Sequence, residues 1–307
     1  MSLSKVPIEF DYSPEFVQLI RDLSAPKSTW PNFQQYISDN LAGRESRYAR
    51  FRLETVPEIE HHCGDLSQKQ VLDFGCGTGA TTVALAERAR HVVGFDIDAV
   101  RLSICNRRAM EHGLQDRISA SNDLERVARE RGSFDLVVLN GVLEHIPASE
   151  PGLRNSVLAR VASVVSPAGY IFINDTPNRL LPFDLHTTQL WWIPWTTPGS
   201  SWAYRRALEK QRFFATTDLS AGPRGMEEAG AWGLTYWDIA GVLRSHGFAC
   251  LNLAKGHDRR LRYRPARANR YRGVFETVMY VIGPRLLRAP LTAFMPNLTN
   301  LVFQRQH

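Results

Sequence analysis

The stretch VLDFGCGTG, residues 71–79, combines a short apolar run, an acid at Asp73 and glycines at Gly75, Gly77 and Gly79. A glycine-rich turn between a strand and a helix lets a ligand approach the backbone where any Cβ would collide. The helix that follows points its N–H groups at the same place. The stretch therefore indicates a cofactor site, the alternative being a tight turn without a ligand.

The spacing of these glycines narrows the class of ligand that the turn could bind. It matches neither the GxGxxG fingerprint of dinucleotide sites nor the GxxxxGK of a P-loop. An acid such as Asp73 would repel a pyrophosphate but suits a cation. In GFDID, residues 94–98, Asp96 is placed to accept both hydroxyls of a ribose, although Asp96 or Asp98 can also act as a helix N-cap. We expect a cationic, ribose-bearing ligand without a phosphate.

The segment around this stretch alternates apolar runs of strand length with helical patterns, which is the signature of βαβ units and a parallel sheet. The expected strands are 70–74, 91–96, 118–121, 134–140 and 169–175. The expected helices between them are 81–89, 99–112 and 155–165, the last stopped by a turn at Pro167 and Gly169. A helix at 236–246 and strands at 248–253 and 298–304 follow further on. The fold class is α/β.

Four motifs follow one another within residues 69–175: VLDFGCGTG, VVGFDID, FDLVVLNGVLEHI and YIFI. Their order and their spacing along the chain are the basis of a comparison with a known family. Together they resemble the class I S-adenosylmethionine-dependent methyltransferases. The resemblance implies a Rossmann-like, doubly wound, seven-stranded and mostly parallel sheet. It also implies S-adenosyl-L-methionine as the methyl donor and S-adenosyl-L-homocysteine as the product.

The resemblance further implies which residues hold the donor. Asp73 and the backbone from Gly75 to Gly79 would hold the methionine portion, and Asp96 the ribose. The sequence ASNDLE has Asn-Asp where the family more commonly has Gly-Asp, so Asn122 is an alternative to Asp123 at the adenine edge. The full implied set is Asp73, Gly75, Cys76, Gly77, Gly79, Asp96, Ile97 flanking the adenine, Asn122, Asp123 with Leu124 at the adenine edge, and Asn140 near the methyl group.

Changes in composition and hydrophobic pattern divide the chain into four segments. Residues 1–66 form a helical N-terminal cap, with helical stretches near 30–41 and 48–61, and residues 67–175 form the donor-binding core. Residues 176–235 are a substrate lid inserted after the fifth strand, too irregular for core. Residues 236–307 complete the core and carry a basic and apolar C-terminal insertion.

Catalytic candidates come from the lid and from the LEH sequence. In DLHTTQLWW, His186 could deprotonate a hydroxyl while Asp184 fixes its tautomer, or both could cap loop backbone. His145 is a second candidate base, though the resemblance favours a pocket wall. Glu144 alone is a thin basis for a metal, so no metal site is expected. Trp191, Trp192, Trp195 and Trp202 either form lid core or stack on a sugar, aryl or isoprenoid substrate.

The bulk properties constrain partners. The formal net charge of +6 favours anionic partners, and seven arginines lie in the basic run 255–272. Four scattered cysteines suggest neither a zinc site nor disulfides, and no apolar run is long enough for a span, so a cytoplasmic location is expected. The apolar C-terminal region could touch a membrane surface or form a homodimer interface, or simply pack on the sheet.

These inferences lead to one leading function. We expect O-methylation of a hydroxyl on a sugar, glycolipid, quinone-like or natural-product molecule, including glycan- or lipid-linked acceptors. The alternatives are an RNA methyltransferase, suggested by the basic run but without an NPPY-like signature, and a non-catalytic donor-binding protein.

Overall fold

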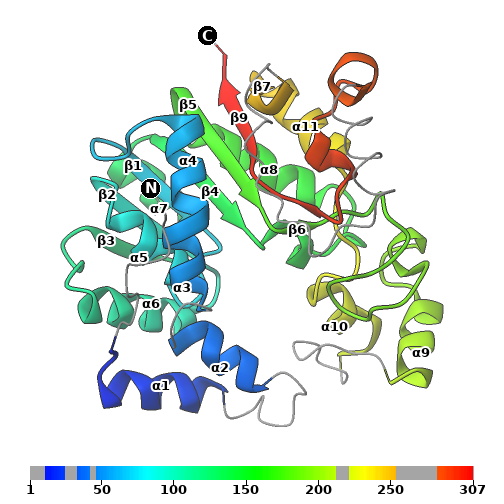
Figure 1. Ribbon diagram of the computed structural model, residues 1–307, viewed down its shortest axis with the longest axis horizontal. Coiled ribbons are helices and arrows are strands. Elements are labelled where there is room, and N and C mark those ends of the chain that lie inside the picture. The colour runs from blue at the N-terminus through cyan, green and yellow to red at the C-terminus, as the bar shows by residue number, and fades with distance from the viewer. Residues whose placement is uncertain (1–10, 25–32, 42–45, 212–220, 254–281, 307) are drawn as a thin grey trace. The chain divides into compact units, whose positions relative to one another are not determined.

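The computed structural model describes residues 11–24, 33–41, 46–211, 221–253 and 282–306, shown in Figure 1. The predicted basic run 255–272 and most of the apolar C-terminal insertion lie outside the described residues. By their contacts the described elements fall into two compact units, Met1–Val137 and Val138–His307, and each is described by itself.

One sheet carries the fold. Its seven strands are hydrogen-bonded in the order β3-β2-β1-β4-β5-β9-β7, which confirms the expected doubly wound, mostly parallel α/β architecture. The order reverses direction after β1, because β1 to β3 are added on one side and the later strands on the other.

The first unit contains the parallel strands β1 (Gln70–Phe74), β2 (His91–Phe95) and β3 (Ile118–Ser121). The side chains of β1 and β2 are buried except at the first residue, as expected for parallel strands, whereas β3 is buried only at its two ends. A helix follows each strand: α5 (Ala80–Ala86), α6 (Ala99–Glu111) and α7 (Leu124–Arg131). All three strands and two of the three helices were expected. Helix α7 was missed, because LERVARER is so strongly charged.

The N-terminal part of this unit is helical, as expected. It comprises α1 (Pro14–Ser24), α2 (Phe33–Leu41), α3 (Arg47–Arg50), a π-helical turn η3 (Phe51–Thr55) and α4 (Val56–Cys63). Helix α1, which was not expected, buries Phe16 and Ile20, four residues apart on one face, against Ile104 of α6.

The second unit contains the other strands. Strand β4 (Phe134–Asn140) starts at the end of the first unit, and β5 (Val165–Asn174), β7 (Phe248–Cys250) and β9 (Leu301–Arg305) follow. Strand β9 runs antiparallel to both β5 and β7, and Figure 1 shows β5 and β9 side by side. Helices α8 (Leu153–Ser163) and α11 (Tyr236–Ser245) complete the expected pattern.

Three sequence-based boundaries in this unit were wrong. Strand β5 begins at Val165, so Pro167 and Gly169 lie inside it rather than in a turn before it. Ala168 accommodates the irregularity with a φ of 59°. Strand β7 ends at Cys250, and Leu251–Leu253 form a 3-10 turn. The last expected strand is interrupted: β8 (Asn297–Leu298) pairs with β6 (Thr176–Pro177) in a small second sheet.

The segment expected to be too irregular for core has a core of its own, so that expectation was wrong. Its elements are a 3-10 turn η5 (Ile193–Trp195), α9 (Ser201–Glu209) and α10 (Gly222–Glu228). Between them they bury Ile193, Ala203, Met226 and Trp232, among others. The indole N–H of Trp232 donates to the Thr196 hydroxyl at 3.1 Å, which satisfies its one polar atom inside this cluster.

Candidate functional site: donor loop and acidic cluster

The glycine-rich loop is pinned to the end of β2. The backbone N–H groups of Gly75 and Cys76 both donate to the carbonyl of Phe95, at 2.7 and 2.9 Å. Gly75, Gly77 and Gly79 all have positive φ angles, between 54° and 84°, which residues with a Cβ rarely adopt. The alternate spacing of the glycines therefore reflects three left-handed positions in one short loop.

Two of these glycines have different surroundings. A Cβ added to Gly79 would lie 2.7 Å from Sγ and 2.9 Å from Cα of Cys105, so Gly79 lets α6 pack against the loop. A Cβ added to Gly77 would meet no atom within 4 Å. The open space at Gly77 is what a loop that presents its backbone to a ligand requires.

Asp96 links the loop to the end of β2. Its Oδ2 accepts from the N–H of Gly77 at 2.9 Å, and its Oδ1 accepts from the N–H of Asp98 at 3.0 Å. Asp98 itself caps α6 by accepting from the N–H groups of Val100 and Arg101. The capping role proposed for either acid thus belongs to Asp98. Ile97, between them, is 86% exposed, so its side chain is accessible to a ligand.

Asp73 lies beneath the loop and is 1% exposed. The hydroxyl of Thr82 donates to its Oδ2 at 2.7 Å. Burial raises the pKa of Asp73 to about 7, the Thr82 hydrogen bond lowers it, and the nearby charge of Asp96 raises it further. Thr82 was not among the predicted residues; its place in the first turn of the helix after the loop is the signal that could have found it.

The residues after β3 take local structural roles. The side chain of Asp123 accepts from the N–H of Arg126 at 2.9 Å and caps α7. Asn122 and Asp123 are exposed, whereas Leu124 is buried. Their contact with the adenine edge stays a prediction, and the structure does not choose between Asn122 and Asp123.

Asn140 ends β4, and the structure pairs it with a residue of β5. Its Oδ1 accepts from Nδ2 of Asn174 at 2.8 Å, and the carbonyl of Asn174 accepts from the N–H of Gly141 at 3.0 Å. The predicted role of Asn140 near the methyl group is untested.

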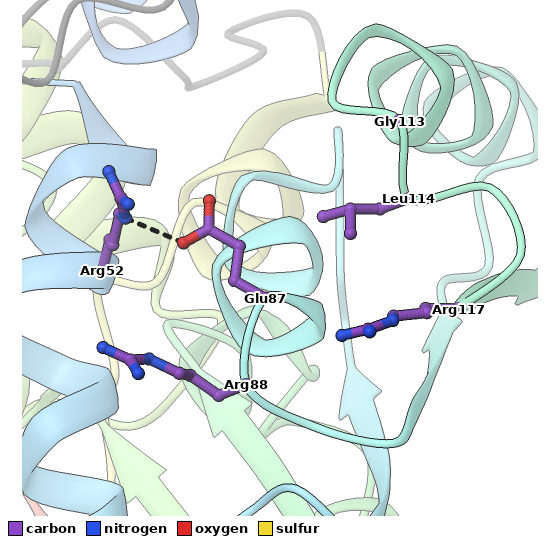
Figure 2. Close-up of a pocket in the computed structure, with 6 residues that line it drawn as sticks. All are labelled: Arg52, Glu87, Arg88, Gly113, Leu114 and Arg117. Carbon is purple, nitrogen blue, oxygen red and sulfur yellow. Dashed lines mark ion pairs between the residues drawn. The ribbon is translucent and has the colours of Figure 1, made fainter.

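A pocket lies elsewhere on the first unit, away from the glycine-rich loop. It has a volume of about 520 Å³ and is lined by Arg52, Glu87, Arg88, Gly113, Leu114 and Arg117, as Figure 2 shows. Arg52 Nε is 2.7 Å from Glu87, whose carboxylate also accepts from the hydroxyl of Tyr48. None of the predicted donor residues lines this cavity, so it is not the donor site.

A second group of polar side chains lies in the second unit. Glu144 and His145 belong to a 3-10 turn, η4 (Leu143–His145), and Nε2 of His145 lies 3.8 Å from Oε1 of Glu144. Glu144 is fully buried, and burial raises its pKa to about 8, with the charge of Asp175 acting in the same direction. The imidazole of His186 joins them, with its ring centroid 5.7 Å from that of His145.

Two features bring His186 to this place. Gly230, with a φ of 94°, lies so close that a Cβ there would be 2.8 Å from Cδ2 of His186 and 3.0 Å from Cγ of Glu144. The loop carrying His186 is folded around Asp184. Sequence reasoning paired neither Gly230 nor Glu144 with His186, since they come from separate parts of the chain.

Asp184 holds backbone, one of the two roles considered for it. Its Oδ1 accepts from the N–H groups of His186 and Thr187, both at 2.9 Å. Its Oδ2 accepts from the N–H and the hydroxyl of Thr188, both at 2.7 Å. With four hydrogen bonds from its own loop, Asp184 fixes the conformation of that loop. The expectation that Asp184 orients the imidazole of His186 is therefore corrected.

The tryptophans of the predicted lid are split between core and surface. Trp232 is buried, whereas Trp191, Trp192, Trp195 and Trp202 are each exposed by about half, between 48% and 56%. The rings of Trp191, Trp192 and Trp195 contact one another in sequence. Their role as lid core is therefore wrong, and a contact with a substrate stays a prediction.

Comparison with known proteins agrees with the loop chemistry. A model of the methyltransferase domain family matches residues 42–221, more than half of the chain. The ubiquinone biosynthesis O-methyltransferase of Bordetella avium is 27% identical over 203 residues, covering 66% of this chain and 78% of that protein. The ubiquinone biosynthesis O-methyltransferase of Aeromonas salmonicida is 34% identical over 121 residues, covering 39% of this chain and 48% of that protein.

Among solved structures, the N-methyltransferase NodS from Bradyrhizobium japonicum with S-adenosyl-L-homocysteine is 13% identical to this chain, with a TM-score of 0.42. The match covers 76% of this chain and 87% of that one.

The parallel strands β1 to β3, a left-handed glycine loop and an acid after the end of β2 define a site for a nucleoside-bearing ligand. The chain belongs to the methyltransferase domain family, and it is an S-adenosylmethionine-dependent methyltransferase. The residues fit this donor, because Gly77 leaves open space above the loop and Asp96 stands beside it.

Proposed function

We propose that this methyltransferase transfers the methyl group to the hydroxyl of a quinone-like aromatic small molecule. The support is the similarity to proteins named ubiquinone biosynthesis O-methyltransferase and the chemistry of the second unit. The donor, when bound, supplies an electrophilic methyl group as a sulfonium. The protein's own task is to position the acceptor, exclude water and take up the hydroxyl proton.

One observation carries the choice of oxygen over nitrogen. A hydroxyl must lose a proton to become a good nucleophile, whereas a neutral amine needs mainly orientation. The second unit gathers a buried carboxylate and two imidazoles whose reactive atoms all lie within 4.8 Å of one another. Of this group, Glu144, His145 and His186, the two histidines offer imidazole nitrogens that can take up the proton of a hydroxyl.

The test is an assay of the purified protein with S-adenosylmethionine and two probes of similar shape, a catechol and an aromatic amine. We expect the catechol to gain one methyl group on oxygen, read by mass spectrometry. Methylation of the amine with none of the catechol would overturn the proposal. His186→Ala should lower turnover while leaving donor binding unchanged, and unchanged turnover would remove His186 from the reaction.

Two further expectations remain proposals. The described residues include no helix of sufficient length and apolarity to cross a bilayer. We propose a cytoplasmic location because all four cysteines are free thiols, as in a reducing compartment. The RNA alternative gains no support, since the basic run that suggested it lies outside the described residues.

A further inference from the structure

We propose that Glu144, His145 and His186 form a binding site for a divalent transition-metal ion. Each residue offers one ligand atom, and the three atoms lie within 4.8 Å of one another. The inference concerns ion binding by residues of the second unit alone, so it does not depend on which acceptor the enzyme methylates.

The first argument is that the carboxylate of Glu144 is buried without a hydrogen-bond partner. Its side chain is fully buried, and neither carboxylate oxygen has a hydrogen-bond partner among the described residues. A buried carboxylate without a partner is strongly disfavoured unless it is neutralised or bound to a cation. The hydroxyl of Thr176 lies close enough to lower the pKa of Glu144, but it makes no hydrogen bond of ordinary geometry with the carboxylate.

The guanidinium of Arg154 influences Glu144 electrostatically but makes no hydrogen bond to its carboxylate. Arg154 donates to the backbone carbonyls of Ile146 and Gly233, at 2.7 and 2.8 Å. Its Nη2 donates to the carbonyls of Trp232 and Glu144 itself, at 2.6 and 3.3 Å. Arg154 therefore ties the surrounding backbone together and leaves both carboxylate oxygens of Glu144 without a hydrogen bond.

The second argument is the tautomer of His145. Nδ1 of His145 lies 2.6 Å from the backbone carbonyl of Glu228, which can only accept a hydrogen bond. Nδ1 must therefore carry a proton, so in the neutral ring Nε2 bears the lone pair. Nε2 is the nitrogen on the Glu144 side, 3.8 Å from Oε1. Metal-bound histidines in proteins are oriented in this way, through a carbonyl on the other ring nitrogen.

The third argument is that His186 is held in place rather than projecting from a mobile turn. Asp184 fixes the loop through its four hydrogen bonds, and Thr187 adds one from its hydroxyl to the carbonyl of Ala229 at 3.0 Å. Gly230 leaves no room for a Cβ between its backbone and His186. A loop anchored on both sides of the imidazole makes a preorganised ligand.

The ligand set indicates the kind of ion. Two imidazoles and one carboxylate suit zinc and its first-row neighbours, whereas magnesium and calcium prefer oxygen ligands. Metal–ligand distances of about 2.1 Å place tetrahedral ligand atoms about 3.4 Å apart, so closure requires side-chain shifts of roughly 1 Å. Three protein ligands leave a position for water. If the proposed function holds, that position would also suit an acceptor oxygen, whose proton the ion would make more acidic.

The test uses the full chain, stripped with a chelator and titrated with cobalt(II) or zinc(II) without donor or acceptor. We expect one ion per chain and a visible cobalt spectrum of a low-coordinate site. Glu144→Gln and His186→Ala should each weaken binding at least tenfold. The matched control is His246→Gln, at an exposed helix end of the same unit, which should bind as the parent does.

Two outcomes overturn the inference: no ion binding by the parent chain, or undiminished binding by both Glu144→Gln and His186→Ala when circular dichroism shows that they are folded. The result is separable from the proposed function. A chain that binds cobalt through these residues but methylates no catechol refutes only the function, and a stripped chain that methylates catechol but binds no ion refutes only the metal site.

Discussion

The hydroxyl of Thr82 donates a 2.7 Å hydrogen bond to Oδ2 of Asp73, and both side chains are buried beneath the glycine-rich loop. This bond offsets part of the cost of burying the carboxylate. It joins the end of β1 to the start of α5, the two elements that the loop connects.

Thr82→Val, which keeps the shape but removes the donor, should destabilise the chain. We expect a loss of about 1–3 kcal/mol in the free energy of unfolding, larger at pH 8 than at pH 5, since the carboxylate is charged above its pKa of about 7. Urea unfolding at the two pH values measures it. Thr82→Ser retains the hydroxyl and should lose much less; equal losses for both variants would show that the methyl group, not the bond, matters.

Asp96→Asn should weaken donor binding. The carboxylate accepts from both Gly77 and Asp98, and an amide can accept only through its one oxygen. We expect at least a tenfold rise in the Kd for S-adenosylhomocysteine, measured by calorimetry. Asp98→Asn is the matched control, because asparagine caps a helix as well as aspartate does. A similar loss at Asp98 would mean that the loop's structure, rather than a ligand contact at Asp96, is affected.

The two alanine substitutions Gly77→Ala and Gly79→Ala should separate binding from folding. At Gly79 the new methyl group would collide with Cys105, so we expect a loss of several kcal/mol in stability, on the order of core overpacking. At Gly77 the methyl group enters open space, so the backbone strain of about 1–2 kcal/mol is the main cost to folding. Thermal unfolding and donor affinity, measured on both variants, separate the two effects. Gly77→Ala should lose affinity for the donor while remaining folded.

Arg108→Lys should loosen the N-terminal helices. The buried guanidinium donates to the carbonyls of Thr78 and Asn40 and to the hydroxyl of Tyr12, at 2.8, 3.0 and 2.6 Å. A lysine cannot reproduce this fork. Hydrogen exchange over α1 and α2 should accelerate at least tenfold. Arg101→Lys, at an exposed position on the same helix, should leave exchange unaltered, and equal protection in both variants would refute the anchoring role.

Glu144→Gln should flatten the dependence of stability on pH. The folded carboxyl has a pKa of about 8, against an ordinary value of 4.5, so the folded state binds more protons than the unfolded state between these values. The parent chain should therefore lose stability as the pH rises from about 4.5 to 8, and the variant should lose less. Unfolding in the presence of a chelator measures this. Parallel pH profiles would contradict the assignment.

Much of the donor half could be read locally. Strand-length apolar runs, a glycine loop and an acid after the next strand lie within about thirty residues of one another, and backbone geometry is governed by neighbours in the chain. The choice between Asp96 and Asp98 could not be made in this way. Both are good caps by composition, and only the hydrogen bond from Gly77 to Asp96 distinguishes them.

The sequence by itself determined the class of fold and the donor loop, because periodicity and left-handed glycine positions are local properties of the chain. Only the tertiary structure decided what Asp184 and His186 do. Asp184 organises its own loop, while Gly230, forty-four positions beyond His186, permits the imidazole to reach the buried Glu144. Contacts between distant segments depend on how their surfaces pack, and no spacing in the sequence encodes that packing directly.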